Sequence, residues 1–313
     1  MNFRNDMKNK KFLITGISGF VGSHLAKKLQ TMGAVVYGTS RKKSARNIFP
    51  LNLLNRFALA KILKDRKIDI CIHLGGISIV QKGQLNPYTT FKTNIQATLN
   101  ILECCRKFGL EKVIIPSTSH VYGENSVPFL EDYPAKPSRP YETSKTAADL
   151  ISQSYAETFD LPVFIPRFVN IYGPGDLHFN RLIPKTIKSA LQGHPPTMWG
   201  GKAKRSFLYI DDAVDAYIKL IRQIPDSGSN RIFNFGTDEI ISVENLIKKI
   251  IYLTSGSQPI QRTEEDRQHE IPVQYVSWKK AKKMLGWKPK VSLDRGLIKT
   301  IRWYRKFIKT HDQ

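Results

Sequence analysis

The sequence Thr-Gly-Ile-Ser-Gly-Phe-Val-Gly at residues 15–22 decides the fold class of this chain. It follows an apolar run at residues 11–15 that predicts a buried strand, and it opens residues 20–32, whose apolar side chains recur on one face of a predicted helix. Glycines at such a junction allow a tight turn, close approach of the backbone to a pyrophosphate, and packing of the helix against the strand. The amino end of the helix then faces the phosphates. We therefore predict a dinucleotide-binding turn, in which the residues at the cofactor are Gly16, Gly19, Phe20, Val21 and Gly22.

Strands and helices alternate through the first half of the chain. The expected strands cover residues 11–15, 34–38, 69–74, 112–116 and 161–168. The expected helices between them cover residues 20–32, 56–65, 87–108 and 141–159. This alternation predicts a parallel sheet with right-handed crossovers.

The alternation stops near residue 170. Beyond it, the expected elements are a helix at 181–191, strands at 207–210 and 231–235, and helices at about 242–253, 277–285 and 292–309. We predict an α/β fold, a Rossmann-type doubly wound parallel sheet with a smaller, discontinuous C-terminal substrate domain. The dinucleotide-binding domain is expected to cover residues 1–170 and 206–237, and the substrate-binding domain residues 171–205 and 238–313.

The composition is that of a globular protein without a membrane segment. Of the 313 residues, 41% are hydrophobic and 24% are charged, which fits one large or two modest domains. No apolar run approaches the ~18 residues of a membrane span, and the apolar run after the basic start is too short for a signal peptide. Cys71, Cys104 and Cys105, two of them adjacent, argue against a disulfide framework. We predict a cytoplasmic protein with reduced thiols and no membrane partner.

The net charge of +23 has three interpretations. It could serve nucleic-acid binding through counterion release, attract an anionic small substrate, or reflect lysines spread over solvated faces. The lysines are scattered, and the densest region, residues 279–290, is interrupted by Met-Leu-Gly-Trp at 284–287. We favour the solvated lysines first and an anionic substrate second, and we predict no nucleic-acid partner.

Tyr141 and Lys145 are candidates for proton transfer. Four residues apart on a predicted helix, the two side chains share one face. A lysine ammonium beside a phenol favours the phenolate. A free tyrosine titrates near ~10, so a base that works near pH 7 needs roughly three units of depression, about 4 kcal/mol. Alone, the spacing is common by chance, but together with the upstream glycine turn it indicates a base beside a nicotinamide.

The end of the second strand discriminates between the two nicotinamide cofactors. An acidic residue there would hydrogen-bond the ribose hydroxyl. This chain has Ser40 followed by Arg41, Lys42 and Lys43, so a cationic cluster stands where a 2′-phosphate would lie. A solvated basic loop is the alternative interpretation. We predict NADP, with NAD as the alternative.

With these features, the chain resembles an extended short-chain dehydrogenase/reductase of the nucleotide-sugar epimerase/dehydratase family, over nearly its whole length. One mark departs from the usual pattern, because residues 73–76 read His-Leu-Gly-Gly where the family usually has His-Leu-Ala-Ala. The other marks are the motifs at residues 15–22, 117–123, 141–145, 167–174, 205–212 and 285–289.

The resemblance implies roles for the proton-transfer residues. Tyr141 would remove the proton from a sugar hydroxyl while hydride leaves the same carbon for the nicotinamide, and Lys145 would lower the tyrosine pKa and bond the nicotinamide ribose. Thr118 would hydrogen-bond the sugar oxygen; its alternative role is to cap backbone at a strand end. The cofactor would be tightly bound and recycled. The further residues expected at the cofactor are Leu74, Gly75 and Arg167.

Ser119 and His120 discriminate between reactions within the family. Similar 4,6-dehydratases usually carry an acidic residue at these positions for proton transfer at carbons 5 and 6 of the sugar. Either His120 performs that transfer, which its unperturbed pKa near ~6.5 permits, or no elimination occurs. Residues 173–184 and 269–275 also look like the CDP- and dTDP-sugar branch. We predict a 4,6-dehydratase, a lyase of polysaccharide biosynthesis; the alternatives are an epimerase, a 4-keto reductase and, distantly, a catalytically idle NADP-sensing or nucleic-acid-binding protein.

The resemblance also implies a nucleotide-diphosphate sugar as the substrate. Arginine forks match phosphate oxygens, and Arg205 corresponds to the diphosphate arginine of the family, with Arg267 or Arg262 as a second candidate. Asn170 is expected at the substrate phosphate. The other residues expected at the nucleotide are Arg181 and Leu182. Helices at 87–108 and 141–159 would pair in a homodimer, and no metal site is expected; the base and the sugar stay open.

Overall fold

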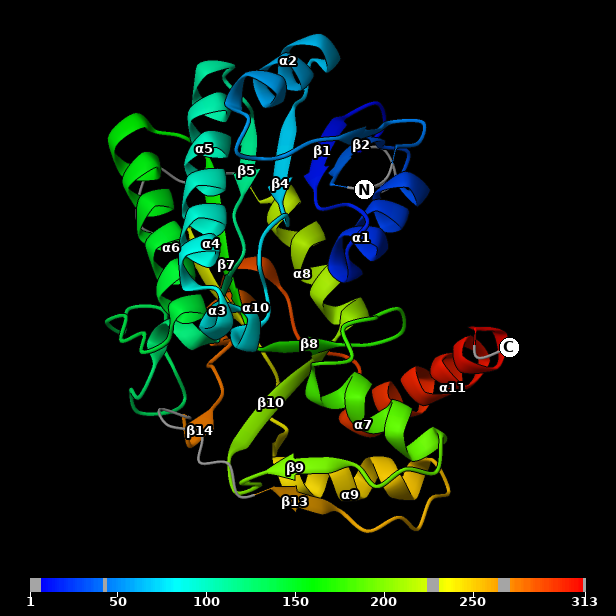
Figure 1. Cartoon of the computed structure of the whole chain (residues 1–313). Helices are drawn as coiled ribbons and strands as arrows, with labels where there is room; N and C mark the ends of the chain where they lie inside the picture. The colour runs from blue at the N-terminus through cyan, green and yellow to red at the C-terminus, as the bar shows by residue number, and fades with distance from the viewer. Residues whose placement is uncertain (1–6, 42–43, 224–230, 264–270, 312–313) are drawn as a thin grey trace. The chain divides into compact units, whose positions relative to one another are not determined.

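The structure is a computed structural model that describes residues 7–41, 44–223, 231–263 and 271–311 (Figure 1). The chain forms two compact units, and both are discontinuous in sequence. The first unit comprises Met1–Val121, Pro137–Arg167 and Val214–Phe233, and the second comprises Tyr122–Lys136, Phe168–Ala213 and Asn234–Gln313.

The first unit is built on an eight-stranded sheet with the order β11-β7-β5-β4-β1-β2-β3, to which β6 is added beside β7. The pairs β1–β2, β1–β4, β2–β3, β4–β5 and β5–β7 are all parallel. The strands are β1 (Lys11–Thr15), β2 (Val35–Ser40), β3 (Ile48–Pro50), β4 (Ile70–His73), β5 (Lys112–Ile114), β6 (Ser117–Thr118), β7 (Val163–Phe168) and β11 (Ile232–Phe235). The strand order reverses between β1 and β4, and doubly wound sheets bind ligands outside the carboxyl ends of strands at such a switch point. The predicted Rossmann-type α/β fold is confirmed.

Helices flank this sheet, and α5 and α6 run side by side (Figure 1). The helices are α1 (Phe20–Thr31), α2 (Arg56–Arg66), α3 (Val80–Leu85), α4 (Pro87–Phe91), the π-helix η1 (Lys92–Gln96), α5 (Ala97–Lys107), the 3₁₀ helix η2 (Ser119–Tyr122), α6 (Pro140–Phe159) and α8 (Ile210–Arg222). The single helix predicted at 87–108 is therefore interrupted by a π-helix. Within it, the Asn94 amide donates to Ser144 Oγ at 2.9 Å and its Oδ1 accepts from Ile77 N at 2.8 Å. These long-range bonds have no signal in the local sequence.

The core of the first unit lies between the sheet and α2, α5 and α6. Its buried apolar residues include Leu13, Leu59, Ile101 and Val113. The three cysteines are buried in the same core as free thiols. No described helix is both long enough and apolar enough to span a membrane.

The second unit contains a four-stranded sheet with the order β12-β10-β14, in which β8 is added beside β10, and a separate parallel pair of β9 and β13. The strands are β8 (Asn170–Tyr172), β9 (Thr197–Trp199), β10 (Lys204–Tyr209), β12 (Ile240–Ser242), β13 (Gln261–Thr263) and β14 (Val273–Gln274). The helices are α7 (Leu182–Leu191), α9 (Val243–Leu253), α10 (Lys279–Leu285) and α11 (Leu293–His311), of which α7, α9 and α11 pack on one another. Among the strands of this unit, the sequence predicted β10, at residues 207–210. The other strands of the unit are too short to display a periodicity of two residues.

Candidate active site

The glycine turn joins β1 to α1 and leaves little room for a Cβ at Gly16 or Gly22. Gly16 has a φ of +68°, and a Cβ there would lie 3.0 Å from Gly75 Cα and from Leu74 O. A Cβ on Gly22 would lie 2.5 Å from Gly16 O. Gly19 is the N-cap of α1, and the first turn of α1 contains no acidic residue. The open, uncapped amino end of a helix behind a glycine turn fits the pyrophosphate of a dinucleotide.

The carboxyl end of β2 reaches the same turn. Ser40 is buried, and its Oγ lies 3.0 Å from Ser18 Oγ inside the glycine turn. Arg41 follows and is exposed, whereas Lys42 and Lys43 lie outside the described residues. The residues at this strand end, Ser40 and Arg41, carry no carboxylate.

The carboxyl end of β4 is tied to β1 through Thr15. Its Oγ1 accepts a hydrogen bond from Gly75 N at 3.0 Å and lies 2.8 Å from His73 Nδ1. Burial lowers the pKa of His73 to about 3, with a smaller contribution from the Lys145 charge, so the ring is neutral at pH 7. The hydroxyl can therefore donate to Nδ1, and the backbone at Leu74 and Gly75 is held against the glycine turn.

The start of α6 carries Tyr141, and Lys145 lies one turn later on the same helix. Both side chains are half-buried. The Lys145 ammonium donates to Pro116 O at 2.5 Å. Pro116 lies between β5 and β6, so this bond holds the ammonium next to the start of β6. Burial lowers the pKa of Lys145 to about 8, and the charge of Asp149 opposes this shift. The ammonium is therefore charged at neutral pH and can stabilise a phenolate.

The residues Thr118, Ser119 and His120 lie at the end of β6 and in η2. Thr118 and Ser119 are buried, and Thr118 Oγ1 accepts from His120 N at 3.3 Å. The His120 ring meets the Tyr141 ring edge to face, with 6.2 Å between the ring centroids. The structure therefore brings His120 and Tyr141 together, from segments about twenty residues apart in sequence.

Glu142 was not predicted from the sequence. It follows Tyr141 on α6, is fully buried, and contacts His120 Nδ1 at 3.2 Å and Arg139 Nη2 at 2.6 Å. Burial opposes ionisation of Glu142, but the hydrogen bonds and charges of His120 and Arg139 outweigh it and lower its pKa to about 2. The local signal was weaker: an acidic residue in the first turn of a helix, two positions after a proline.

Arg167, which the sequence assigned to the cofactor, forms a buried ion pair with Asp149 of α6. Its Nε lies 2.9 Å from Asp149 Oδ2 and its Nη2 lies 3.0 Å from Oδ1. This two-pronged geometry is the strongest form of an arginine–carboxylate pair. It links β7 to the helix that carries Tyr141 and Lys145.

The residues assigned to the substrate lie in the second unit, except for Arg267, which lies outside the described residues. Arg205 is buried in β10 and donates through Nη1 to Lys204 O at 2.9 Å. Asn170 begins β8 and pairs in register with Phe207 of β10. Arg181 is the N-cap of α7, which starts at Leu182, and its Nη1 lies 2.9 Å from Asp176 Oδ2.

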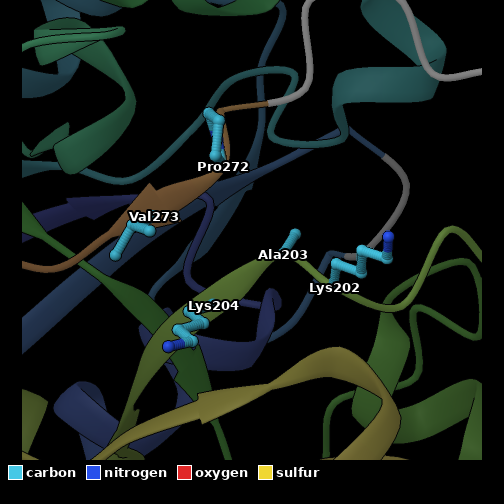
Figure 2. Close-up of a pocket in the computed structure, with 5 residues that line it drawn as sticks. All are labelled: Lys202, Ala203, Lys204, Pro272 and Val273. Atoms are coloured by element: carbon cyan, nitrogen blue, oxygen red, sulfur yellow. The ribbon is translucent and has the colours of Figure 1, made fainter.

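Two other features of the second unit bear on the substrate assignments. Arg262, the alternative second arginine, is exposed in β13 and pairs with Glu244 at 2.9 Å. A small open hollow of about 280 Å³ is lined by Lys202, Ala203, Lys204, Pro272 and Val273 (Figure 2). Adjacent residues on a strand point to opposite faces, so the Lys204 side chain at this hollow and the Arg205 side chain leave β10 on opposite sides. We do not assign the hollow to the candidate site.

No group of three or more metal-ligating side chains occurs within the part of the chain that the structure describes. The glycine turn, with its left-handed Gly16 and close backbone contacts, fits a dinucleotide instead. A hydroxyl, a phenol and an ammonium near the carboxyl ends of the strands form a set that can move protons during hydride transfer.

Comparison with known proteins assigns the family. The sequence profile described as "NAD dependent epimerase/dehydratase family" matches residues 12–236. The UDP-N-acetyl-alpha-D-glucosaminuronate decarboxylase of Bacillus cytotoxicus is 33% identical, over 95% of this chain and 98% of that protein. The dTDP-D-glucose 4,6-dehydratase of Dictyostelium discoideum is 29% identical, over 97% of this chain and 84% of that protein.

A solved structure agrees with these sequence matches. The UDP-glucuronic acid 4-epimerase of Bacillus cereus, in complex with UDP-glucuronic acid and NAD, superposes with a TM-score of 0.87. It is 27% identical, and the match covers 95% of this chain and 99% of that one. The chain therefore belongs to the NAD-dependent epimerase/dehydratase family, and it is an enzyme of the nucleotide-sugar epimerase, dehydratase and decarboxylase group. Decarboxylation is an activity that the sequence analysis did not predict.

Proposed function

We propose that this enzyme oxidises carbon 4 of a nucleotide-diphosphate sugar and then eliminates water across carbons 5 and 6, as a sugar-nucleotide 4,6-dehydratase. The observation that carries the proposal is the position of His120, whose ring lies against Tyr141 and beside a buried carboxylate. Oxidation at carbon 4 needs one base. Elimination needs a second proton-transfer group, and the neighbouring histidine can supply it.

Tyr141 and His120 perform different proton transfers in this reaction. Tyr141, kept ionised by the Lys145 ammonium, takes the proton of the 4-hydroxyl while Thr118 hydrogen-bonds that oxygen. A nicotinamide cofactor held at the glycine turn would supply the hydride acceptor for carbon 4 and the hydride donor for carbon 6. His120 takes the proton from carbon 5, whose electron pair moves towards the 4-keto group, and gives it to the departing 6-hydroxyl, so that water leaves. His120 then returns a solvent proton to carbon 5, and Tyr141 releases its proton to solvent.

A second candidate is decarboxylation of a nucleotide-uronic acid, which is favoured by the relative from Bacillus cytotoxicus. A 4-keto uronic acid is a β-keto acid, so carbon dioxide leaves with the electron pair moving towards the ketone. The resulting enolate takes a proton at carbon 5, and His120 could donate it. Epimerisation at carbon 4 requires no proton at carbon 5, and it therefore makes less use of His120.

Incubation with CDP-, dTDP-, GDP- and UDP-linked hexoses and uronic acids tests these assignments by mass spectrometry. A dehydratase gives a 4-keto-6-deoxy product, a decarboxylase releases carbon dioxide, an epimerase gives an isomer, and a reductase consumes NADPH. Tyr141→Phe should lower turnover by at least about 100-fold, because general-base catalysis contributes about 10²–10⁴-fold. Full turnover in the Tyr141→Phe variant would contradict the proposal.

We further propose NADP as the cofactor, with Ser40 and Arg41 at its 2′-phosphate. The alternative is NAD, which is bound in the epimerase of Bacillus cereus. A carboxylate at this position would bond a ribose hydroxyl and repel a phosphate. Arg41→Asp should therefore weaken NADPH binding by at least about tenfold while NADH binding changes little. Equal losses for the two cofactors in a fluorescence titration would count against NADP.

We also propose that the enzyme is a homodimer. Leu85, Tyr88 and Leu150 lie in α3, α4 and α6 and are exposed by 73%, 74% and 55%. Burying such side chains against a second copy would stabilise the pair by about 1.5–3 kcal/mol for each side chain. Light scattering of Leu150→Glu should show a smaller mass than the native chain, and an unchanged mass would oppose this interface.

A further inference from the structure

The carboxylate of Glu142 is saturated with hydrogen-bond donors. Its Oε1 accepts from His120 Nδ1 at 3.2 Å, Arg139 Nε at 3.0 Å and Arg139 Nη2 at 2.6 Å. Its Oε2 accepts from Ser138 N at 3.3 Å, Ser138 Oγ at 3.1 Å and Arg139 N at 3.3 Å. The side chain has no exposed surface.

Helix capping explains only part of these contacts. Glu142 is the third residue of α6, and the bond that its Oε2 accepts from Arg139 N, the backbone nitrogen of the N-cap, is that of a capping box. The contacts of Oε1 with His120 and with the Arg139 guanidinium serve no cap. They connect α6 to η2, which contains His120.

We propose that Glu142 is a positioning residue for His120: it holds the Nδ1–H of the ring and leaves Nε2 as the atom that exchanges a proton with the sugar. The imidazole has two nitrogens, and a hydrogen bond from one of them fixes which nitrogen carries the proton in the neutral ring. Among the residues that the structure describes, Nε2 has no hydrogen-bond partner. The proposal rests on the proposed function for the use of this proton, although the pairing itself can be tested without a substrate.

Charges of opposite sign lie close to His120. The groups that face it are the Glu142 carboxylate, the Tyr141 ring at 6.2 Å, and Arg139, which shares the carboxylate. Glu142 stays ionised throughout the working range, because its pKa is about 2 against the opposing effect of burial. The carboxylate can accept the Nδ1–H of the ring, whereas the guanidinium has only donors and cannot accept it. Removing the carboxylate should therefore release the Nδ1–H, and removing the guanidinium should leave it in place.

This prediction is tested by ¹⁵N NMR of the histidine ring nitrogens in the full chain, with His120→Asn to assign the His120 signals. The neutral His120 ring of the native chain should carry its proton on Nδ1, and Glu142→Gln should lower the fraction of this tautomer at least about threefold. Arg139→Gln should leave the proton on Nδ1, and Glu157→Gln is the matched control without effect, because Glu157 is exposed on the same helix. An Nε2–H tautomer in the native chain, or an unchanged tautomer in Glu142→Gln, would overturn the pairing. If Glu142→Gln fails to fold, the tautomer of the native chain still decides.

A second readout separates the role of Glu142 from the proposed function. In deuterium oxide, the substrate found by the screen should take up deuterium at the carbon beside the transient ketone. In a single turnover, transient reduction of the cofactor reports hydride transfer separately, before the hydride returns to the sugar. Glu142→Gln should lower the ratio of deuterium uptake to hydride transfer by at least about tenfold, and Glu157→Gln should leave it unchanged. An unchanged ratio in Glu142→Gln overturns the positioning role alone. If no nucleotide sugar reduces the cofactor even transiently, the proposed function fails and the tautomer of His120 decides the pairing.

Discussion

The substitution Asp149→Asn tests the electrostatics of the helix that carries Tyr141 and Lys145. The Asp149 side chain is 2% exposed and receives two hydrogen bonds from Arg167, at 2.9 Å and 3.0 Å. Its charge also raises the pKa of Lys145, one turn earlier on α6, against the larger lowering by burial. Asparagine keeps the size of the side chain and removes the charge.

The expected loss of stability follows from the burial of the pair. Removing one partner of a buried ion pair costs about 3–5 kcal/mol, because the other charge stays in a poorly solvated place. We expect the lower end, about 3 kcal/mol, since asparagine can still accept one hydrogen bond from Arg167.

The effect on Lys145 can be worked out from the same charge. Two unit charges about 6 Å apart interact by about 3 kcal/mol at an effective dielectric constant of ~20, equivalent to ~2 pKa units. Arg167 neutralises part of this field, so we expect the Lys145 pKa to fall by about one unit, from about 8 to about 7. The charged fraction of Lys145 would then fall about threefold at pH 7.5 and up to about tenfold above pH 8.5.

Two measurements check this prediction. Urea unfolding gives the loss of stability, and the rate of hydride transfer against pH gives the Lys145 titration. In the native enzyme the rate should decline as the pH rises through about 8, because the ammonium that supports the phenolate is lost, and in Asp149→Asn the decline should begin about one unit lower. The control is Asp65→Asn, which removes an exposed partner of Lys61 at 2.8 Å and should change neither property. An alkaline limb that does not move, or a stability loss below about 1 kcal/mol, would refute the reasoning.

Three further predictions concern the rest of the chain. Burial lowers the pKa of Lys112 to about 8 from an ordinary 10.5. The folded protein therefore loses this proton at a lower pH than the unfolded chain does, and the free energy of unfolding rises between pH 8 and pH 10.5. Lys112→Met should remove this rise of up to about 3 kcal/mol, as measured by urea unfolding at pH 7 and pH 10. Gly123→Ala should lower the free energy of unfolding by more than about 2 kcal/mol, because φ is +56° and the new Cβ would lie 1.8 Å from Lys136 O. Gly109 has a similar φ of +60°, but a Cβ there would have no atom within 4 Å. Gly109→Ala should therefore cost only about 1–2 kcal/mol, and thermal unfolding measures both losses. The thiols should not react with a disulfide reagent at pH 8 until the chain unfolds, because all three are buried and burial raises the pKa of Cys104 to about 11; rapid native labelling would contradict this.

Sequence reasoning predicted the parts of the fold that local patterns encode. The run at residues 11–15, the glycine turn and the helix after it form β1, the turn and α1 within a few residues. Parallel strands buried on both faces have continuous apolar sequences, and a tight turn requires glycines that the sequence shows directly. The short strands of the second unit and the π-helix at Lys92–Gln96 have neither a continuous apolar run nor such glycines.

The partners of charged residues were beyond prediction for a different reason. Arg167 was assigned to the cofactor from a motif, but its buried partner Asp149 lies eighteen positions earlier, on α6. The sequence does not show which face of that helix meets β7. In the same way, Glu142 reads as an ordinary polar residue of a helix start, and its contact with His120 depends on how η2 meets α6. Such pairings depend on how helices and strands pack together, and the periodicity of the sequence does not predict them.

The buried Glu142 bears on which reaction the enzyme performs. An ionised carboxylate without exposure to solvent costs several kcal/mol unless nearby cations and donors compensate it. A helix can be capped by a surface serine or aspartate for about 1 kcal/mol of stability and without that burial. Hydride transfer at carbon 4 needs Tyr141, Lys145 and Thr118, whereas Glu142 Oε1 contacts His120 and Arg139. A reaction confined to carbon 4 does not use a proton on His120. Its contact with His120 favours chemistry in which a second proton moves at carbon 5.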